Sequence, residues 1–231
     1  MHVCLSDLDG SGVVDFGDVA LALHRQGARV GLFDADIYGP SQPLMLGVTG
    51  RRPQIVNGNQ MVPITAHGIK CNSVGFLVDD NQAMVWRGPM VVGAFNQILN
   101  DTSWGELDYL IIDMPPGTGD IQLSLAQSVP VTGAVIVTTP QDVALLDAKR
   151  GIEMFRKVQV PILGVVENMG LHICSQCGHS EHMFGEGGAD RIAYAYDVHR
   201  ETLLLNGFRT IFRAADRKLS LYQFKTPKVL S

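Results

Sequence analysis

Continuously apolar runs alternate with amphipathic stretches along most of the chain. The apolar runs are too hydrophobic for strands with one face in water, so they predict parallel strands covered on both faces, at residues 29–36, 107–115, 133–140 and 160–169. The amphipathic stretches predict helices over residues 18–26, 89–100, 120–128 and 142–157. This alternation predicts an α/β fold with a doubly wound, mostly parallel sheet flanked by helices. The segment 51–79 alternates less cleanly and predicts a hairpin or short extra strands.

Polar, Pro or Gly residues follow directly after three of the predicted strands, in DADIYGP, DMPPGTGD and TTPQD. Ligands of doubly wound sheets bind at the carboxyl ends of the strands. The three clusters therefore predict one shared site.

Asp113 closes the apolar strand in IIDMPPGTGD. A carboxylate there is costly without a partner, and P-loop NTPases place the Mg²⁺-holding carboxylate at such a position. The glycines behind it let backbone N–H groups approach a γ-phosphate, which makes Pro116, Gly117, Thr118 and Gly119 candidate nucleotide-binding residues. The alternative is an ordinary strand-to-helix turn in which Asp120 caps the next helix.

Asp34 and Asp36, in LFDADIYGPS, form a second pair of carboxylates at a strand end. Such a pair can orient an attacking water and help to hold a metal. An Asp-rich turn stiffened by Gly39 and Pro40 is the alternative. We assign Asp34, Asp36 and Asp113 as the candidate catalytic residues.

Composition narrows the class of protein. A net charge of −5 over 231 residues argues against electrostatic nucleic-acid binding. No apolar run approaches the roughly 18–20 residues of a membrane span, and MHVCLSDLDG has none of the features of a signal or transit peptide. We expect a cytoplasmic protein that binds neither nucleic acid nor membrane, with Cys4 and Cys71 as buried thiols.

Cys174 and Cys177 form a C-x-x-C pair in CSQCGHSEH. Thiolates at this spacing can face one metal centre, either zinc or an iron–sulfur cluster. The residues alone favour a zinc site that adds His179 and His182, although that spacing is cramped. A thioredoxin-like redox pair fits less well, because this C-x-x-C does not open a helix after a first strand.

Several segments together resemble the Mrp/ApbC family of iron–sulfur cluster carrier ATPases, relatives of the deviant-Walker proteins MinD and ParA. They are GARVGLFDADIYGPSQPLMLG, MVWRGPM, LDYLIIDMPPGTGDIQLSLAQ, GAVIVTTPQDVALLDAKRGIEMF, VPILGVVENMG, and CSQCG followed by FGEGGA. The resemblance runs from about residue 19 to about 197 and implies a P-loop NTPase-like fold over residues 1–197, with 198–231 as a divergent extension.

The resemblance also implies a function: a homodimer that binds ATP and Mg²⁺, carries an iron–sulfur cluster and hands it to apo-protein clients. One C-x-x-C supplies two ligands, whereas a [4Fe–4S] cluster takes four, so a cluster shared across a dimer is expected. The resemblance ranks the cluster above zinc at Cys174 and Cys177. It also places Asn168 at the adenine base, where a plain turn residue is the alternative.

Residues 6–14, SDLDGSGVV, fall where the family has its phosphate-binding loop, so Gly10, Ser11 and Gly12 are candidate nucleotide ligands. Asp7 replaces the signature lysine, Gly12 the lysine that reaches the β- and γ-phosphates, and Val13 the Mg²⁺-binding hydroxyl. Each lost contact to phosphate is worth roughly 1.5–3 kcal/mol. We therefore expect impaired ATP hydrolysis.

The same stretch fits a calcium-binding loop. Asp7, Asp9, Ser11, Asp15 and Asp18 take ligand positions of the EF-hand pattern, and Gly12 takes its turn position. Asp18 is shorter than the usual Glu, so we expect a weak Ca²⁺ site at best. Three other functions stay open: a catalytically inactive scaffold that dimerises with intact homologues, a ParA/MinD-like partitioning ATPase, and a Ca²⁺-regulated variant.

Overall fold

The computed structural model describes residues 16–76, 88–174, 176–198 and 211–214. These residues belong to two compact units. The first unit lies within residues 16–128, and the second consists of residues 129–198 and 211–214.

The first unit contains a mostly parallel sheet. Its helices are α1 (Phe16–Arg25), α2 (Gln42–Met45), α3 (Gly88–Asp101) and α4 (Asp120–Ser128), with a short 3₁₀ turn η1 (Val74–Phe76). Its strands are β1 (Val30–Asp34), β2 (Gln54–Val56), β3 (Gln60–Val62), β4 (Ile64–Ala66), β5 (Ile69–Ser73) and β6 (Tyr109–Asp113). The order across the main sheet is β4-β5-β1-β6, with β5, β1 and β6 parallel and β4 antiparallel at the edge.

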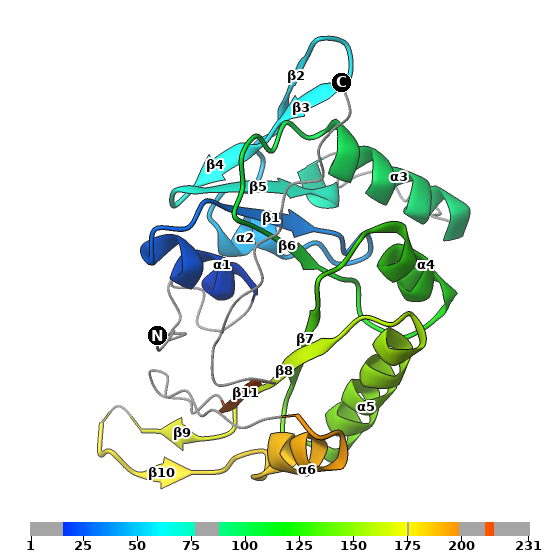
Figure 1. Cartoon of the computed structure of the whole chain (residues 1–231). Coiled ribbons are helices and arrows are strands. Elements are labelled where there is room, and N and C mark those ends of the chain that lie inside the picture. The colour runs from blue at the N-terminus through cyan, green and yellow to red at the C-terminus, as the bar shows by residue number, and fades with distance from the viewer. Residues whose placement is uncertain (1–15, 77–87, 175, 199–210, 215–231) are drawn as a thin grey trace. The chain divides into compact units, whose positions relative to one another are not determined.

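The interior of this unit follows from the apolar runs. All five residues of β1 are buried, and Phe33 stacks on Phe95 of α3 with ring centroids 5.1 Å apart. Helix α1 packs against β1, and α3 packs beside α4 (Figure 1). The β2–β3 ribbon extends beyond the main sheet of this unit (Figure 1).

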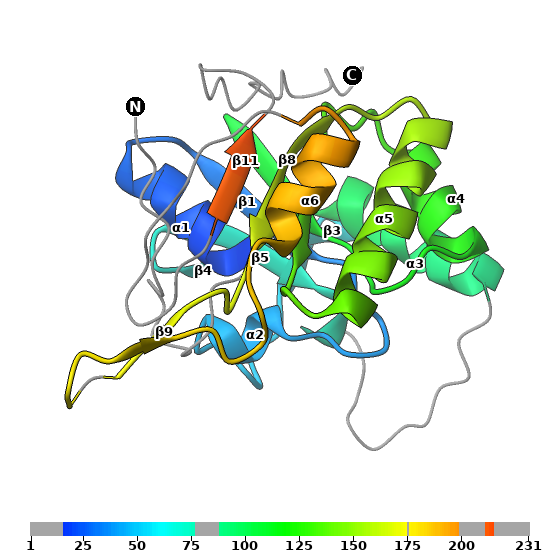
Figure 2. The same cartoon turned by 90° about the horizontal axis from the view of Figure 1, so that it is seen from below.

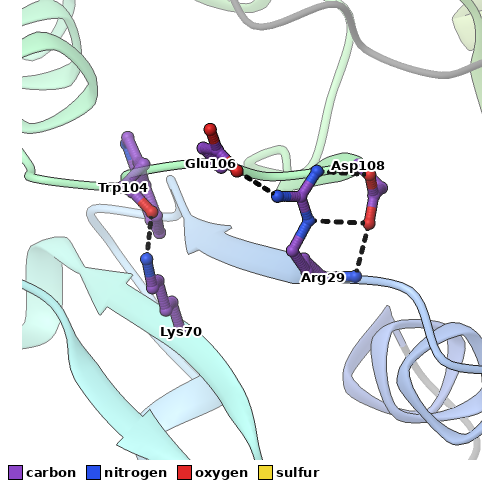
Figure 3. A network of polar contacts seen from close by, with 5 residues as sticks. All are labelled: Arg29, Lys70, Trp104, Glu106 and Asp108. Carbon is purple, nitrogen blue, oxygen red and sulfur yellow. Dashed lines mark hydrogen bonds and ion pairs between the residues drawn. The ribbon is translucent and has the colours of Figure 1, made fainter.

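An exposed ion-pair network joins the amino ends of β1 and β6 (Figure 3). Arg29 donates from Nη2 to Asp108 Oδ1 at 2.9 Å and from Nε to Asp108 Oδ2 at 3.1 Å. Its Nη1 lies 2.5 Å from Glu106, and the backbone N–H of Arg29 also donates to Asp108 at 2.8 Å. Nearby, the Lys70 ammonium donates to the carbonyl of Trp104. These contacts lie at the opposite end of the strands from the predicted site.

The second unit contains a three-stranded sheet in the order β11-β8-β7, with β7 and β8 parallel and β11 antiparallel to β8. Its elements are β7 (Ala134–Thr138), α5 (Asp142–Lys157), β8 (Ile162–Glu167), β9 (His172–Ile173), β10 (Ser180–Glu181), α6 (Gly188–Ala195) and β11 (Ile211–Ala214). Helix α5 packs on β7 and α6 packs on β8, and the two helices lie side by side (Figure 2). Leu145, Ile152, Val165 and Ile192 form the centre of this core.

The α/β class with a mostly parallel sheet flanked by helices is confirmed. Helix α5 has the predicted bounds, and the segment 51–79 forms the β2–β3 hairpin and two short strands as predicted. The sequence did not indicate that β5 lies inside the sheet, parallel to β1. Strand β11 lies within the predicted extension 198–231 and pairs with β8; the domain boundaries themselves stay a prediction. Among the described residues, no helix is long and apolar enough to cross a membrane.

Candidate functional site

The carboxyl ends of three parallel strands in the first unit meet in one row. Asp34 at the end of β1 is in register with Ser73 of β5 on one side and with Asp113 of β6 on the other. The predicted convergence of DADIYGP and DMPPGTGD is therefore confirmed. The third cluster, TTPQD, follows β7 in the second unit.

Asp34 is completely buried, and both of its carboxylate oxygens accept hydrogen bonds from the protein. Oδ1 accepts the backbone N–H of Asp36 at 3.2 Å. Oδ2 accepts the backbone N–H of Gln42 at 3.1 Å and the hydroxyl of Ser73 at 3.0 Å. These contacts tie the start of α2 and the end of β5 to the end of β1.

Burial dominates the titration of this carboxyl. Loss of water raises the pKa of Asp34 from 3.8 to about 6, although its N–H and hydroxyl donors oppose the shift. Cys71 lies in the same interior, and burial, followed by the charge of Asp34, raises the pKa of its thiol to about 12. Cys71 is thus the buried, inert thiol that the sequence predicted. The other predicted buried thiol, Cys4, lies outside the described residues.

Asp36 lies just beyond the end of β1 and is only partly buried. Its Oδ1 accepts the backbone N–H groups of Tyr38 at 3.1 Å and Gly39 at 3.2 Å. This is the Asp-stiffened turn of the alternative interpretation. Asp36 differs from Asp34 in keeping part of its surface open to solvent.

Asp113 is held by a side chain that the sequence did not single out. Gln42, in the first turn of α2, donates from Nε2 to Asp113 Oδ2 at 2.9 Å. The backbone N–H of the same Gln42 donates to Asp34. One buried residue therefore connects the two strand-end carboxylates.

The loop after Asp113 is fastened by Gln122 of α4. Its Oε1 accepts the N–H of Gly119 at 3.0 Å, and its Nε2 donates to the carbonyl of Pro116 at 2.7 Å. Gly117 has φ +102°, a conformation that requires glycine. Pro116, Gly117 and Gly119 are exposed and Thr118 is partly exposed, so the loop backbone is open to solvent. Asp120 is the first residue of α4.

Asn168 lies in the second unit, directly after β8, and its side chain organises a turn. Its backbone N–H donates to Thr138 at 2.8 Å, and its Oδ1 accepts the N–H of Met169 at 2.9 Å. Met169 has φ +57°. These contacts fit the turn interpretation, and the adenine contact stays a prediction.

The C-x-x-C pair forms the turn of the β9–β10 hairpin. The N–H of Cys174 donates to the carbonyl of His179 at 2.8 Å, and the N–H of Gly178 donates to the carbonyl of Cys174 at 2.9 Å. The pKa of the Cys174 thiol is lowered by the backbone N–H of Cys177, then by that of Gln176 and by the Cys177 side chain. Both cysteines are free of disulfide bonds, and Cys177 is exposed. A lowered pKa favours the thiolate, which is the form of cysteine that binds a metal.

The predicted histidine ligands do not join this pair. His182 Nδ1 lies 2.5 Å from the carbonyl oxygen of Gly170, and its Nε2 lies 3.0 Å from Glu186. Both ring nitrogens of His182 therefore have protein partners. Within the described part of the chain, no three His, Cys, Asp or Glu side chains gather into a metal-binding group. The four-ligand zinc site within one chain is not formed.

The other predicted residues concern the segment before α1. Six of these candidates lie outside the described residues: the nucleotide candidates Gly10, Ser11 and Gly12, and the calcium candidates Asp7, Asp9 and Asp15. Asp18, the remaining calcium candidate, lies in the first turn of α1 and is completely buried. The phosphate and calcium interpretations of this stretch both stay predictions.

Sequence reasoning missed Gln42 and Ser73. Gln42-Pro43 comes directly after GPS, and Ser73 ends IKCNS, in which Lys70 and Asn72 are polar as well. Because IKCNS is not an apolar run, it offered no sequence signal for Ser73. The link from Gln42 to Asp113 spans 71 residues and had no sequence signal.

Comparison with known proteins gives consistent matches. The family model described as "ParA: NUBPL iron-transfer P-loop NTPase" matches residues 16–206, so the segment 6–14 lies outside the match. The iron–sulfur cluster carrier protein of Pseudomonas fragi is 65% identical over 182 residues, which are 78% of this chain and 63% of that protein. The mouse iron–sulfur cluster transfer protein NUBPL is 51% identical over 180 residues, 78% of this chain and 56% of that protein.

A solved structure agrees with these matches. The nucleotide-binding protein of Archaeoglobus fulgidus, in complex with ADP, is 36% identical to the chain, with a TM-score of 0.67. The match covers 78% of this chain and 70% of that one. The chain spans 63% and 56% of the length of the two curated relatives.

Proposed function

We propose that this protein carries an iron–sulfur cluster and transfers it to client proteins. The chain belongs to the family of NUBPL iron-transfer P-loop NTPases, and the sequence motifs had already indicated a resemblance to iron–sulfur cluster carriers. Cys174 and Cys177 are the proposed ligands. The observation that carries the proposal is the β9–β10 hairpin turn, which holds the two free thiols close together in the chain: the N–H of Cys174 donates to the His179 carbonyl at 2.8 Å, and the N–H of Gly178 donates to the Cys174 carbonyl at 2.9 Å. The backbone N–H groups of the turn, first that of Cys177, also lower the pKa of the Cys174 thiol, and a lower pKa favours the thiolate that binds metal.

The ligand count favours a shared cluster. One chain offers two thiolates, whereas a [4Fe–4S] cluster takes four. Two copies of the hairpin, each with an exposed Cys177, would complete the set. We therefore propose a homodimer with the cluster as cargo between its subunits.

The proposed nucleotide site lies at the carboxyl ends of β5, β1 and β6, where Ser73, Asp34 and Asp113 are in register. Asp113 would hold Mg²⁺, and Gln42 would orient its carboxylate. Asp36 is the better candidate to direct a water, because it is partly exposed, whereas Asp34 has both oxygens committed to protein donors. Asp34 then acts as a positioning residue. Pro116, Gly117, Thr118 and Gly119 would face the γ-phosphate, and Asn168 the adenine.

Hydrolysis is the part we expect to be impaired. In SDLDGSGVV, Asp7 stands where the family has its signature lysine and Gly12 where it has the second lysine, and the carboxylates of this stretch repel a triphosphate. The proposed cluster ligands lie in a different unit from Asp113. Cluster binding is therefore expected to persist when ATP turnover is weak.

The test is anaerobic reconstitution with iron and sulfide, with ATP turnover assayed on the same sample. We expect a cluster with little or no hydrolysis in the wild type, and loss of the iron in a Cys174→Ala/Cys177→Ala double variant. Cys71→Ala is the matched control, because this thiol is buried in the other unit and should leave the iron content unchanged. A full iron and sulfide complement in the double variant would overturn the ligand assignment. Absence of both cluster and turnover in the wild type would favour an inactive scaffold, and turnover typical of an intact P-loop would refute the impairment.

A further inference from the structure

The segment that carries the C-x-x-C turn leaves and re-enters the second unit at one place. It begins after Glu167, the last residue of β8, and returns at Gly188, the first residue of α6. Between them, the β9–β10 hairpin projects away from β8 and α6 in both views (Figures 1 and 2). We call the junction of β8 with the start of α6 the neck.

A buried carboxylate closes the neck. Glu167 is 1% exposed, and its Oε2 accepts the backbone N–H of Ala189 at 2.7 Å. This N–H belongs to the first turn of α6, where the helix dipole favours a negative charge. A buried carboxylate is costly unless it is hydrogen-bonded, and the Ala189 N–H supplies that bond in the closed neck.

The glycines of FGEGGA fit this contact. A Cβ on Gly188 would lie 2.9 Å from Glu167 Oε2 and 2.8 Å from Leu145 Cδ2, closer than real Cβ atoms approach. Gly187, which precedes the helix, has φ +70°. The paired glycines therefore let the helix start directly against the carboxylate.

A second contact lies farther along the same segment. His182 bridges the carbonyl of Gly170 at 2.5 Å and the carboxylate of Glu186 at 3.0 Å. It thereby joins the outgoing and returning chains between the neck and the hairpin. Glu167 differs from this exposed pair in being buried and in binding the helix backbone.

We propose that Glu167 is a positioning residue that holds the neck closed and thereby fixes how the C-x-x-C turn is presented. The consequence for cluster transfer rests on the proposed function, whereas the contact between Glu167 and Ala189 is independent of it. Without the Glu167 contact, β8 and α6 lose their direct hydrogen bond at the neck. The hairpin then samples more orientations, and a bound cluster is more accessible to acceptors and chelators.

The first measurement is amide hydrogen exchange of the cluster-free protein, which requires no cargo. The reporters are the N–H groups of Cys174 and Gly178, whose hydrogen bonds define the turn. Glu167→Ala should raise their exchange rates roughly five- to tenfold, about the effect of losing one hydrogen bond. Glu167→Gln keeps an acceptor oxygen and should stay within about twofold of wild type.

Ile152→Val is the matched control. It trims a completely buried side chain in the core of the same unit without touching the neck. It should lower the melting temperature without selectively exposing the two reporters. If Glu167→Ala does not fold, Gly188→Ala tests the same contact from the helix side and should give the same selective exchange.

The second measurement follows iron release to an excess of chelator after reconstitution. Release should be several-fold faster in Glu167→Ala than in Ile152→Val at matched thermal stability. Equal reporter exchange in these two variants, or faster exchange in Glu167→Gln than in Glu167→Ala, would overturn the proposal. A wild type that binds no cluster would refute the proposed function, and the exchange experiment would still decide the role of Glu167.

Discussion

Asp34 offers the most quantitative prediction, because its environment is fully defined. It is completely buried and accepts three hydrogen bonds, yet burial raises its pKa from 3.8 to about 6. The shift is about 2 pKa units, and each unit corresponds to about 1.36 kcal/mol, so ionised Asp34 destabilises the folded state by about 3 kcal/mol. We expect this cost to appear as a pH dependence of the free energy of unfolding.

The sign follows from proton binding. Between pH 3.8 and about 6, the folded state holds the Asp34 proton while the unfolded state has released it. The free energy of unfolding therefore falls as the pH rises through this window, and the group adds no further slope above about pH 7. Asp34→Asn removes the titration. The wild-type advantage over this variant should shrink by about 2 to 2.5 kcal/mol between pH 4 and pH 7, because at pH 4 the unfolded carboxyl is still partly protonated.

Urea unfolding followed by tryptophan fluorescence is the assay. Trp104, which is largely buried in the first unit, reports on the unit that contains Asp34. The difference between wild type and variant cancels the titration of other groups. Ser73→Ala should move the drop to higher pH, because it removes a donor that stabilises the ionised carboxyl. A difference that is flat within about 1 kcal/mol across this range would refute the assignment of the shift to burial.

Three further predictions concern other contacts. Gln42→Glu places a second carboxylate against Asp113, so the free energy of unfolding of the first unit in urea should fall by about 1–3 kcal/mol at pH 7 and by less at pH 4. An equal fall at the two pH values would contradict a repulsion between the carboxylates. Gly188→Ala should cost about 1–3 kcal/mol through overpacking, whereas Gly151→Ala in α5, whose Cβ would make an ordinary 3.9 Å contact with Ile136 Cδ1, should gain up to about 1 kcal/mol. Thermal unfolding compares the two variants, and equal effects would contradict the steric argument. The Arg29 guanidinium holds the pKa of Asp108 down to about 2, so this ion pair stabilises the folded state above pH 3.8 and loses that effect as the pH falls to 2 (Figure 3). Arg29→Met should return the pKa of Asp108 toward 3.8 in an NMR titration, and an unchanged pKa would contradict the pairing.

The hydrophobic pattern predicted several strands and helices well because each such strand is a continuously apolar run and each such helix repeats its amphipathic period. The predicted helix at 142–157 is α5, and the predicted strand at 107–115 contains β6. The interior position of β5 could not be predicted in the same way. Its sequence, IKCNS, has no continuous apolar run, and parallel pairing with β1 depends on contacts between segments about 39 residues apart.

The candidate site was predictable in its carboxylates and not in their partners. Asp34 and Asp113 stand out because a charge at the end of an apolar run is unusual. Gln42, Ser73 and Glu167 are recognised only once strand register and helix placement bring distant residues together. The contact of Glu167 with Ala189 spans 22 residues and includes the whole hairpin.

The different surroundings of Asp34 and Asp36 explain why neighbouring carboxylates in DAD have different proposed roles. Asp34 is the last residue of a fully buried strand, so it is enclosed on all sides and its oxygens are used by the protein. Asp36 lies after the strand, in a turn that consumes one oxygen and leaves part of the carboxylate in solvent. A buried carboxylate with three internal donors cannot approach a ligand without breaking those bonds, each worth about 1 kcal/mol or more. Asp34 therefore holds neighbouring backbone and side-chain groups in place, whereas Asp36 can contact a water. Substitution of Asp34 should lower the free energy of unfolding more than it changes the chemical step.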